Sequence, residues 1–154
     1  MIQRIQSVYL LIAALLSAGY FFFPFSIKVF DSEEGERIYK LLVHGVQSPD
    51  GSIQSNFLLL ALCILLLVML VLAIFMFQNR KMQIKICWMA VIPCLAIITA
   101  DYFLSDSMGK ESGIKNPVYM IASYIPIFQF VLLRLAIKAI QRDEELIRSA
   151  DRIR

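Results

Sequence analysis

The chain has 154 residues, of which 59% are hydrophobic and only 18% are charged, and its mean hydropathy is +0.71. Soluble domains are closer to half apolar and a quarter charged, so the composition excludes an ordinary soluble domain and indicates an integral membrane protein. The net charge of +3 is too small to indicate nucleic-acid binding by itself, and the length corresponds to one domain.

Four apolar segments predict an all-α integral membrane protein built as a bundle of four transmembrane helices. A hydrocarbon core of about 30 Å needs about 20 helical residues, and each segment is about that long. The first segment follows Arg4 and continues through four phenylalanines, which predicts a retained signal anchor rather than a cleaved signal peptide. The predicted helices cover residues 5–25, 57–77, 84–104 and 117–137 of a transmembrane domain that spans residues 1–137.

The loop over residues 26–55 is longer than a connector between two helices requires. Residues 27–30 and the β-branched and aromatic residues within 37–46 predict two strands, with turn residues at 32–35 between them. A small extracytoplasmic β-hairpin is the favoured interpretation. The alternative is an interfacial helix on the apolar residues of 38–42.

Basic residues divide unequally between the two sides of the predicted bundle. One side holds the link between the second and third helices and the tail after the fourth, with ten of the fifteen basic residues. The other side holds five, diluted by acidic residues. Because basic loops stay in the cytoplasm, both termini of this multi-pass membrane protein are predicted to be cytoplasmic. The ten are Arg4, Arg80, Lys81, Lys85, Arg134, Lys138, Arg142, Arg148, Arg152 and Arg154.

The charged tail over residues 138–154 contains neither proline nor glycine, so the fourth helix is expected to continue into water. Ile140, Ile147, Ala150 and Ile153 recur at helical spacing and form one apolar stripe. Such a stripe either docks on a partner (another protein, lipid headgroups or the chain's own loop) or belongs to a solvated end. The expected docking residues of the link and tail are Arg80, Lys81, Lys85, Ile140, Arg142, Ile147, Arg148, Ala150, Arg152 and Ile153.

Polar residues inside membrane helices are the usual place to look for function. If the third helix enters the membrane at Ile84, Asp101 lies about 25 Å along it, and Arg134 lies equally far along the antiparallel fourth helix. The two side chains are therefore expected near opposite surfaces, where each reaches water.

Two prolines, Pro93 and Pro126, fall near the middle of the third and fourth helices, where proline bends a helix. Two kinked neighbours would frame a small cavity lined by Thr99, Ser123 or Gln129. More often such prolines only bend helices that pack around them.

No catalytic or cofactor motif occurs in the sequence. P-loop, GxSxG, HExxH and dinucleotide patterns are absent, and the single histidine, His44, indicates a surface or packing residue. Cys63, Cys87 and Cys94 lie in apolar runs without a CxxC pair, which predicts buried thiols rather than a disulfide or zinc site. We therefore predict no catalytic residue, metal site or cofactor, and we do not expect an enzyme.

Three stretches of sequence resemble a known family. They read MIQRIQSVYL at residues 1–10, QNRKMQIK at 78–85 and AIQRDEELIRSADRIR at 139–154. The chain resembles an uncharacterised family, a domain of unknown function, of small four-helix inner-membrane proteins found in Bacteroidota. The resemblance covers the whole chain and implies the four-helix topology, but no activity, substrate or cofactor.

The expected function is that of a non-enzymatic accessory or structural subunit of a larger bacterial inner-membrane complex, such as an export or ribosome-associated assembly. It would dock through its basic link and tail. The expected partners are the lipid bilayer and other inner-membrane proteins, with anionic lipid headgroups as a further candidate. Nucleic acid or a ribosome is only weakly indicated, because the polar faces of the link and tail carry few aromatic residues. The alternative is a small transporter or channel that uses the proline-kinked third and fourth helices.

Overall fold

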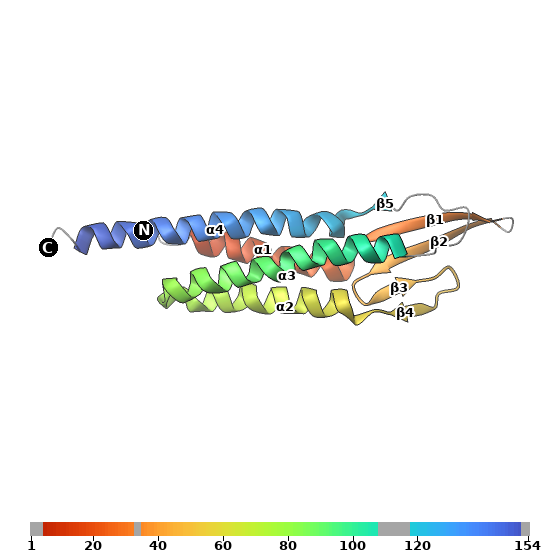
Figure 1. Cartoon of the computed structure of the whole chain (residues 1–154), viewed down its shortest axis with the longest axis horizontal. Helices are drawn as coiled ribbons and strands as arrows, with labels where there is room; N and C mark the ends of the chain where they lie inside the picture. The colour runs from red at the N-terminus through yellow and green to blue at the C-terminus, as the bar shows by residue number, and fades with distance from the viewer. Residues whose placement is uncertain (1–4, 33–34, 108–117, 152–154) are drawn as a thin grey trace.

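The computed structural model describes residues 5–32, 35–107 and 118–151, which form an elongated four-helix bundle with a small sheet at one end (Figure 1). All four helices are long and apolar enough to cross a membrane, so the four predicted helices are confirmed. They are α1 (Ile5–Phe22), α2 (Phe57–Phe75), α3 (Arg80–Ser107) and α4 (Ile121–Asp151), with a short 3-10 helix η1 (Met76–Gln78) after α2.

Each helix turns a stripe of residues toward the centre of the bundle, at spacings of four and three, and α3 and α4 bury further residues beside it (Val91, Pro93, Ala100, Ile125 and Ile137). This 3.5-residue period is typical of helices that cross at a small angle and interlock along their length. Neighbours around the bundle are α1 and α2, α2 and α3, α3 and α4, and α4 and α1. The stripes are Gln6, Leu10, Ala13, Ser17 and Tyr20 in α1; Leu59, Cys63, Leu66, Leu70 and Ala73 in α2; Gln83, Cys87, Ala90, Cys94, Ile97, Asp101 and Ser105 in α3; and Ala122, Pro126, Gln129, Leu133, Ala136 and Ile140 in α4.

Large apolar side chains also cover the outside of the bundle. Leu15 of α1, Ile92 of α3 and Phe128 of α4 are 66%, 69% and 63% exposed, and α2 exposes leucines and valines along its length. Soluble monomers rarely expose a continuous apolar surface of this kind, because water penalises it. Such a surface is typical of helices whose outer faces lie in an apolar surrounding.

The chain between α1 and α2 forms strands. Together with a short strand just before α4, they make up one sheet. β1 (Ser26–Ser32) and β2 (Gly35–Leu42) pair antiparallel, so the predicted hairpin is confirmed and the alternative of an interfacial helix is wrong. The sheet is larger than predicted, with the order β4-β3-β2-β1-β5 among the described residues. Its other strands are β3 (Gly45–Gln47), β4 (Ile53–Ser55) and β5 (Val118–Tyr119).

Gly45 is needed where the chain reverses between β2 and β3. Its φ is +153°, and a Cβ at this position would lie 2.3 Å from the carbonyl oxygen of Gln54 in β4. Only glycine allows the strands to approach this closely. His44, in the turn just before it, is exposed, in agreement with a surface position.

Two helix boundaries differ from the prediction because the sheet takes their residues. α1 ends at Phe22 rather than residue 25, and the N–H of Phe25 donates to the carbonyl oxygen of Leu41 at 2.8 Å. α4 begins at Ile121 rather than residue 117, because β5 pairs with β1 just before it.

The link between α2 and α3 is shorter than predicted. α3 begins at Arg80 rather than residue 84, and Asn79 caps it, since its Oδ1 accepts a hydrogen bond from the N–H of Met82 at 3.3 Å. The basic residues Arg80, Lys81 and Lys85 therefore lie on the first two turns of a helix.

Candidate functional site

The end of the bundle away from the sheet gathers the predicted docking residues and is called the distal end below. It comprises the first turns of α1, the α2–α3 turn with the first turns of α3, and the last turns of α4 (Figure 1). Basic and acidic side chains lie close together there. The charged residues of this end whose side chains are described are Arg80, Lys81, Lys85, Lys138, Arg142, Asp143, Glu144 and Glu145.

Arg80 ties the α2–α3 turn to α4. Its Nη1 donates a 3.2 Å hydrogen bond to the main-chain carbonyl oxygen of Asp143. From there α4 continues to Asp151, about 12 Å further at about 1.5 Å per residue, and passes the end of the α2–α3 turn (Figure 1). One of the partners expected for the tail, the chain's own loop, therefore contacts the start of this segment.

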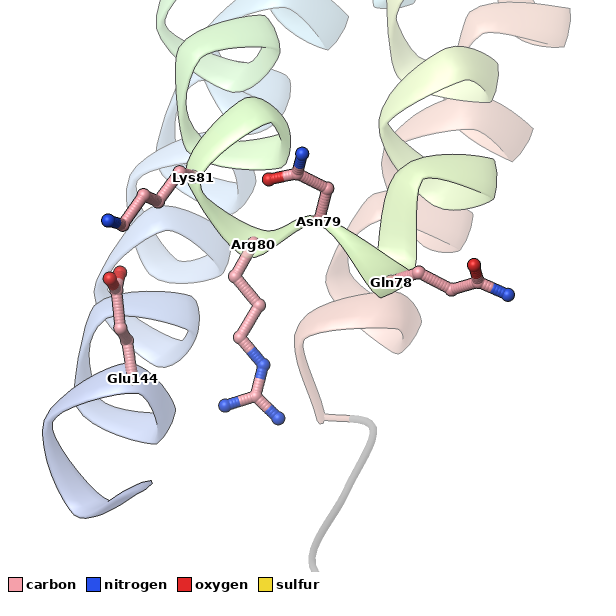
Figure 2. Close-up of a pocket in the computed structure, with 5 residues that line it drawn as sticks. All are labelled: Gln78, Asn79, Arg80, Lys81 and Glu144. Carbon is pink, nitrogen blue, oxygen red and sulfur yellow. The ribbon is translucent and has the colours of Figure 1, made fainter. Parts of the chain in front are cut away.

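A polar pocket of about 540 Å³ lies between the α2–α3 turn and α4 (Figure 2). In Figure 2 the side chains of Lys81 and Glu144 extend on the same side, and that of Arg80 extends from the turn beside them. The pocket therefore offers cationic donors and one carboxylate to a polar group. Its lining residues are Gln78, Asn79, Arg80, Lys81 and Glu144.

A larger groove of about 970 Å³ runs between α1 and α4 at the same end. Its α1 wall is formed by Ile5, Gln6 and Tyr9. Its α4 wall combines apolar and charged side chains, so the groove has both an apolar and a charged part. The residues of this wall are Leu135, Lys138, Ala139, Gln141, Arg142, Asp143, Glu145 and Leu146.

Ile140 is not available for docking, and its prediction as a docking residue is wrong. It is 0% exposed, because the central stripe of α4 continues from Ala136 to Ile140 and packs inside the bundle. Of the other predicted docking residues, Arg80 and Lys81 share the polar pocket, Arg142 lines the groove, and Lys85 is exposed apart from both. The side chains of Ile147, Arg148 and Ala150, and all of Arg152 and Ile153, lie outside the described residues.

Asp101 is 5% exposed, so the expectation that it reaches water is wrong. Ser105 donates to its Oδ1 at 3.1 Å, and the hydroxyl of Ser26 in β1 lies 2.6 Å from that of Ser105. Because Ser105 donates its proton to Asp101, Ser26 must donate to Ser105. The resulting chain of hydrogen bonds joins the sheet to α3.

The same junction holds other polar groups. Lys28 of β1 is 3% exposed, and its Nζ donates to the carbonyl oxygen of Asp106 at 3.1 Å. Burial, together with the nearby Asp101 and Asp106 and Tyr102, raises the pKa of Tyr119. This end of the bundle is therefore held by a polar network rather than by apolar contacts alone.

Arg134 is exposed, and its guanidinium lies over the ring of Trp88, 4.9 Å from the ring centroid. A cation–π contact of this kind stabilises a charged guanidinium at the face of an aromatic ring. The contact joins α3 to α4 on the outer face of the bundle.

Gln129 joins α1 to α4 at the centre of the bundle. It is 0% exposed, and its Nε2 donates to the carbonyl oxygen of Ala13 at 2.9 Å and to Oγ of Ser17 at 2.8 Å. The hydroxyl of Tyr20 donates to Oε1 of Gln129. All the hydrogen-bonding groups of this amide are satisfied, so Gln129 is a structural residue.

The cavity predicted beside the prolines is not formed by the three residues named for it. Thr99 is exposed and donates to carbonyl oxygens of its own helix, whereas Ser123 donates to the carbonyl oxygen of Phe25 at 2.6 Å. Pro93 and Pro126 are both buried, in agreement with prolines that only bend packed helices. Cys94 donates its S–H to the carbonyl oxygen of Pro126 at 3.1 Å.

The three cysteines are buried free thiols, as predicted, with 0–1% of each exposed. Within residues 5–32, 35–107 and 118–151, no group of three histidine, cysteine or acidic side chains is arranged to hold a metal ion.

Two buried glutamines were missed as candidate residues. Gln83 is 0% exposed and its Nε2 donates to the carbonyl oxygen of Ala73 at 2.9 Å, near the end of α2. The Oε1 atoms of Gln83 and of Gln6 accept no hydrogen bond from any described group. Their burial could have been predicted from the sequence, because each glutamine lies at the four-three spacing of the buried residues in its helix and interrupts an otherwise apolar stripe.

Residues 2–153 match the sequence profile of a family described as a domain of unknown function, DUF4293. This match confirms the resemblance to an uncharacterised family. A search of curated protein sequences gave no match.

Proposed function

We propose that this chain, which belongs to the DUF4293 family of unknown function, crosses a bacterial inner membrane four times. The sheet lies outside the cytoplasm and the distal end lies in the cytoplasm. Two observations support this arrangement: the apolar outer faces of all four helices, and the concentration of basic residues at the distal end.

The protein serves as a non-enzymatic subunit of a larger membrane assembly and docks through the distal end. The observation that carries this proposal is the hydrogen bond from Arg80 to the Asp143 carbonyl oxygen, which secures α4 where it passes the α2–α3 turn. A projection that is already ordered loses less conformational entropy on binding than a free tail. The segment after Asp143 is therefore suited to recognition of a partner beside the membrane.

The partner is a neighbouring membrane protein whose cytoplasmic segment presents a carboxylate to the polar pocket. Arg80 and Lys81 supply the cationic donors of that pocket, and Glu144 can pair with a basic residue of the same segment. Hydrogen bonds between charged groups are stronger than neutral ones and orient the two partners. Lys85, exposed one turn further along α3, adds to the positive surface.

Photocrosslinking in the organism that encodes the chain tests this docking. A photoreactive residue at Gln78, exposed at the pocket, should give a defined adduct with one membrane protein, whereas the same residue at Ser52 in the sheet end should not. Arg80→Glu with Lys81→Glu should lower the adduct yield about tenfold, because a charge-assisted hydrogen bond contributes about 1.5–3 kcal/mol. Lys40→Glu, an exposed reversal in β2, should leave it unchanged.

Two results would argue against docking at this pocket. The first is an adduct at Gln78 whose yield does not respond to the charge reversal. The second is the same adduct from Ser52, which would indicate proximity without recognition.

A further inference from the structure

We infer that the groove between α1 and α4 binds a phospholipid with a primary-ammonium headgroup, of the phosphatidylethanolamine class, in the cytoplasmic leaflet. The inference rests on the proposed orientation of the bundle, but not on any protein partner. It is carried by the depth of the groove along the helices, by its pattern of charges and by one buried acceptor.

The groove lies where a membrane changes from hydrocarbon to headgroups. Counted from Ile121, Leu135 is about 21 Å along α4 and Arg142 about 32 Å, against a hydrocarbon thickness of about 30 Å. Gln6, counted back from Phe22, is about 24 Å along α1. Tyr9 and Leu135 are thus at acyl-chain level, Gln6 and Lys138 lie just inside the boundary, and Arg142, Asp143 and Glu145 are at headgroup level.

The charges of the groove match a headgroup that carries both signs. Lys138 and Arg142 lie one helical turn apart on α4 and can bind a phosphate together. Asp143 and Glu145 also line the groove and would repel a headgroup that is only anionic, whereas an ammonium group can pair with one of them. A phosphoethanolamine headgroup therefore satisfies the two basic residues and one carboxylate.

Gln6 supplies an observation that is independent of these charges. It lines the groove and is only 6% exposed, yet its Oε1 accepts no hydrogen bond from any described group. Buried acceptors are nearly always satisfied, so a missing donor is expected at this place. The terminal amide torsion of glutamine has a broad minimum, and a rotation about it presents an acceptor to the groove. An ammonium N–H is a suitable donor, whereas a choline group has none.

The size of the groove agrees with such a ligand. Its volume of about 970 Å³ is at the upper end of the range of about 300–1,000 Å³ that is usual for small-molecule sites. A headgroup with the first part of an acyl chain, lying along Tyr9 and Leu135, would occupy it.

Lipid binding to the purified full-length chain tests the inference. Native mass spectrometry would compare phosphatidylethanolamine, phosphatidylcholine and phosphatidylglycerol with matched acyl chains. Phosphatidylethanolamine should bind about tenfold more tightly than phosphatidylcholine, which has the same phosphate but no N–H donor. It should also bind more tightly than phosphatidylglycerol, which lacks the cation.

Four variants separate the contributions. Gln6→Leu should lower phosphatidylethanolamine affinity toward that of phosphatidylcholine and leave phosphatidylcholine unchanged. Arg142→Gln should weaken all three lipids. Lys40→Gln, exposed in β2 at the other end of the bundle, is the control and should have no effect. If Gln6→Leu does not fold, Glu145→Gln, at an exposed residue, should reduce only the preference for phosphatidylethanolamine.

If the groove binds something else, these experiments give different results, and each of them would overturn the inference. Equal binding of the three lipids, or a preference for phosphatidylglycerol, would exclude recognition of an ammonium headgroup. A protein crosslinked from Ala139, with no lipid retained, would assign the groove to a protein partner. Stronger lipid binding on deletion of residues 2–4, with no effect of Gln6→Leu or Arg142→Gln, would assign it to the chain's own N-terminal residues. Failure to find a docked protein at the polar pocket affects none of these measurements.

Discussion

Arg80 and Asp143, 63 positions apart in the chain, are joined by a 3.2 Å hydrogen bond from the guanidinium of one to the main-chain carbonyl oxygen of the other. The contact places the start of α3 against the third-last turn of α4. It uses the main chain of α4 and leaves the carboxylate of Asp143 to line the groove. The same arginine therefore serves both the polar pocket and the position of α4.

We predict that Arg80→Ala loosens the end of α4 relative to the α2–α3 turn. Spin labels at Gln78→Cys and Ser149→Cys, both exposed positions, should show a broader distance distribution in this variant, because the hydrogen bond that restrains the two segments is lost. The native cysteines are 0–1% exposed and should not take up label. Lys85→Ala should leave the distribution unchanged, and equal widths in Arg80→Ala and the parent would show that this contact does not hold the helix.

Ser105 should be a stabilising residue, although it is a small polar side chain. Ser105→Ala leaves Oδ1 of Asp101 without this donor and Ser26 without its acceptor, so thermal unfolding in detergent should show a loss of about 1–3 kcal/mol. Ser107→Ala, at an exposed hydroxyl that donates to the Leu104 carbonyl oxygen of its own helix, is the matched comparison and should cost much less. Equal losses would show that the link between sheet and helix carries no stability.

Gln129→Leu should destabilise the contact between α1 and α4 by about 1–3 kcal/mol, because it leaves the buried hydroxyl of Tyr20 without an acceptor. Adding Tyr20→Phe removes that orphaned group and should recover part of the loss. Unfolding free energies of the two single variants and the double variant measure this coupling. Strict additivity would mean that the two side chains do not interact.

Gly45→Ala and Gly51→Ala should differ strongly although both glycines have positive φ. A Cβ at Gly45 meets the Gln54 carbonyl oxygen at 2.3 Å, whereas one at Gly51 meets nothing within 4 Å. Gly51→Ala should therefore cost only the backbone strain, about 1–2 kcal/mol. Gly45→Ala should also separate β3 from β4 and make the sheet end more sensitive to limited proteolysis. Similar protease sensitivity of the two variants would contradict the close approach of these strands.

Hydropathy predicted the four helices because segment length and apolar composition are strong signals. It did not show which face of each helix is central, since in a helix such as α2 both the inner and the outer faces are apolar. The signal that remained was small or polar residues at four-three spacing, such as Ala13, Ser17 and Gln129, which allow close approach and hydrogen bonds between helices.

Distance along a helix was easier to predict than rotation about its axis. Asp101 was placed near one end of its helix, but its rotation, set by packing, turns it inward to Ser105. Ile140 has the expected helical spacing. Its burial could not be predicted, because it depends on how far the bundle extends along α4, and that extent is set by where α3 begins. β5 could not be predicted from local pattern, since two residues become a strand only by pairing with β1, far away in the sequence.

The central claim, that this bundle crosses a membrane with its distal end in the cytoplasm, is tested most directly by cysteine accessibility. Ser52→Cys lies at the sheet end and Ser149→Cys on the last turns of α4, both at exposed positions, and the buried native thiols give the unlabelled background. In intact spheroplasts a membrane-impermeant maleimide should label Ser52→Cys at once and Ser149→Cys only after permeabilisation. Labelling of both without permeabilisation, or of Ser149→Cys alone, would contradict the account.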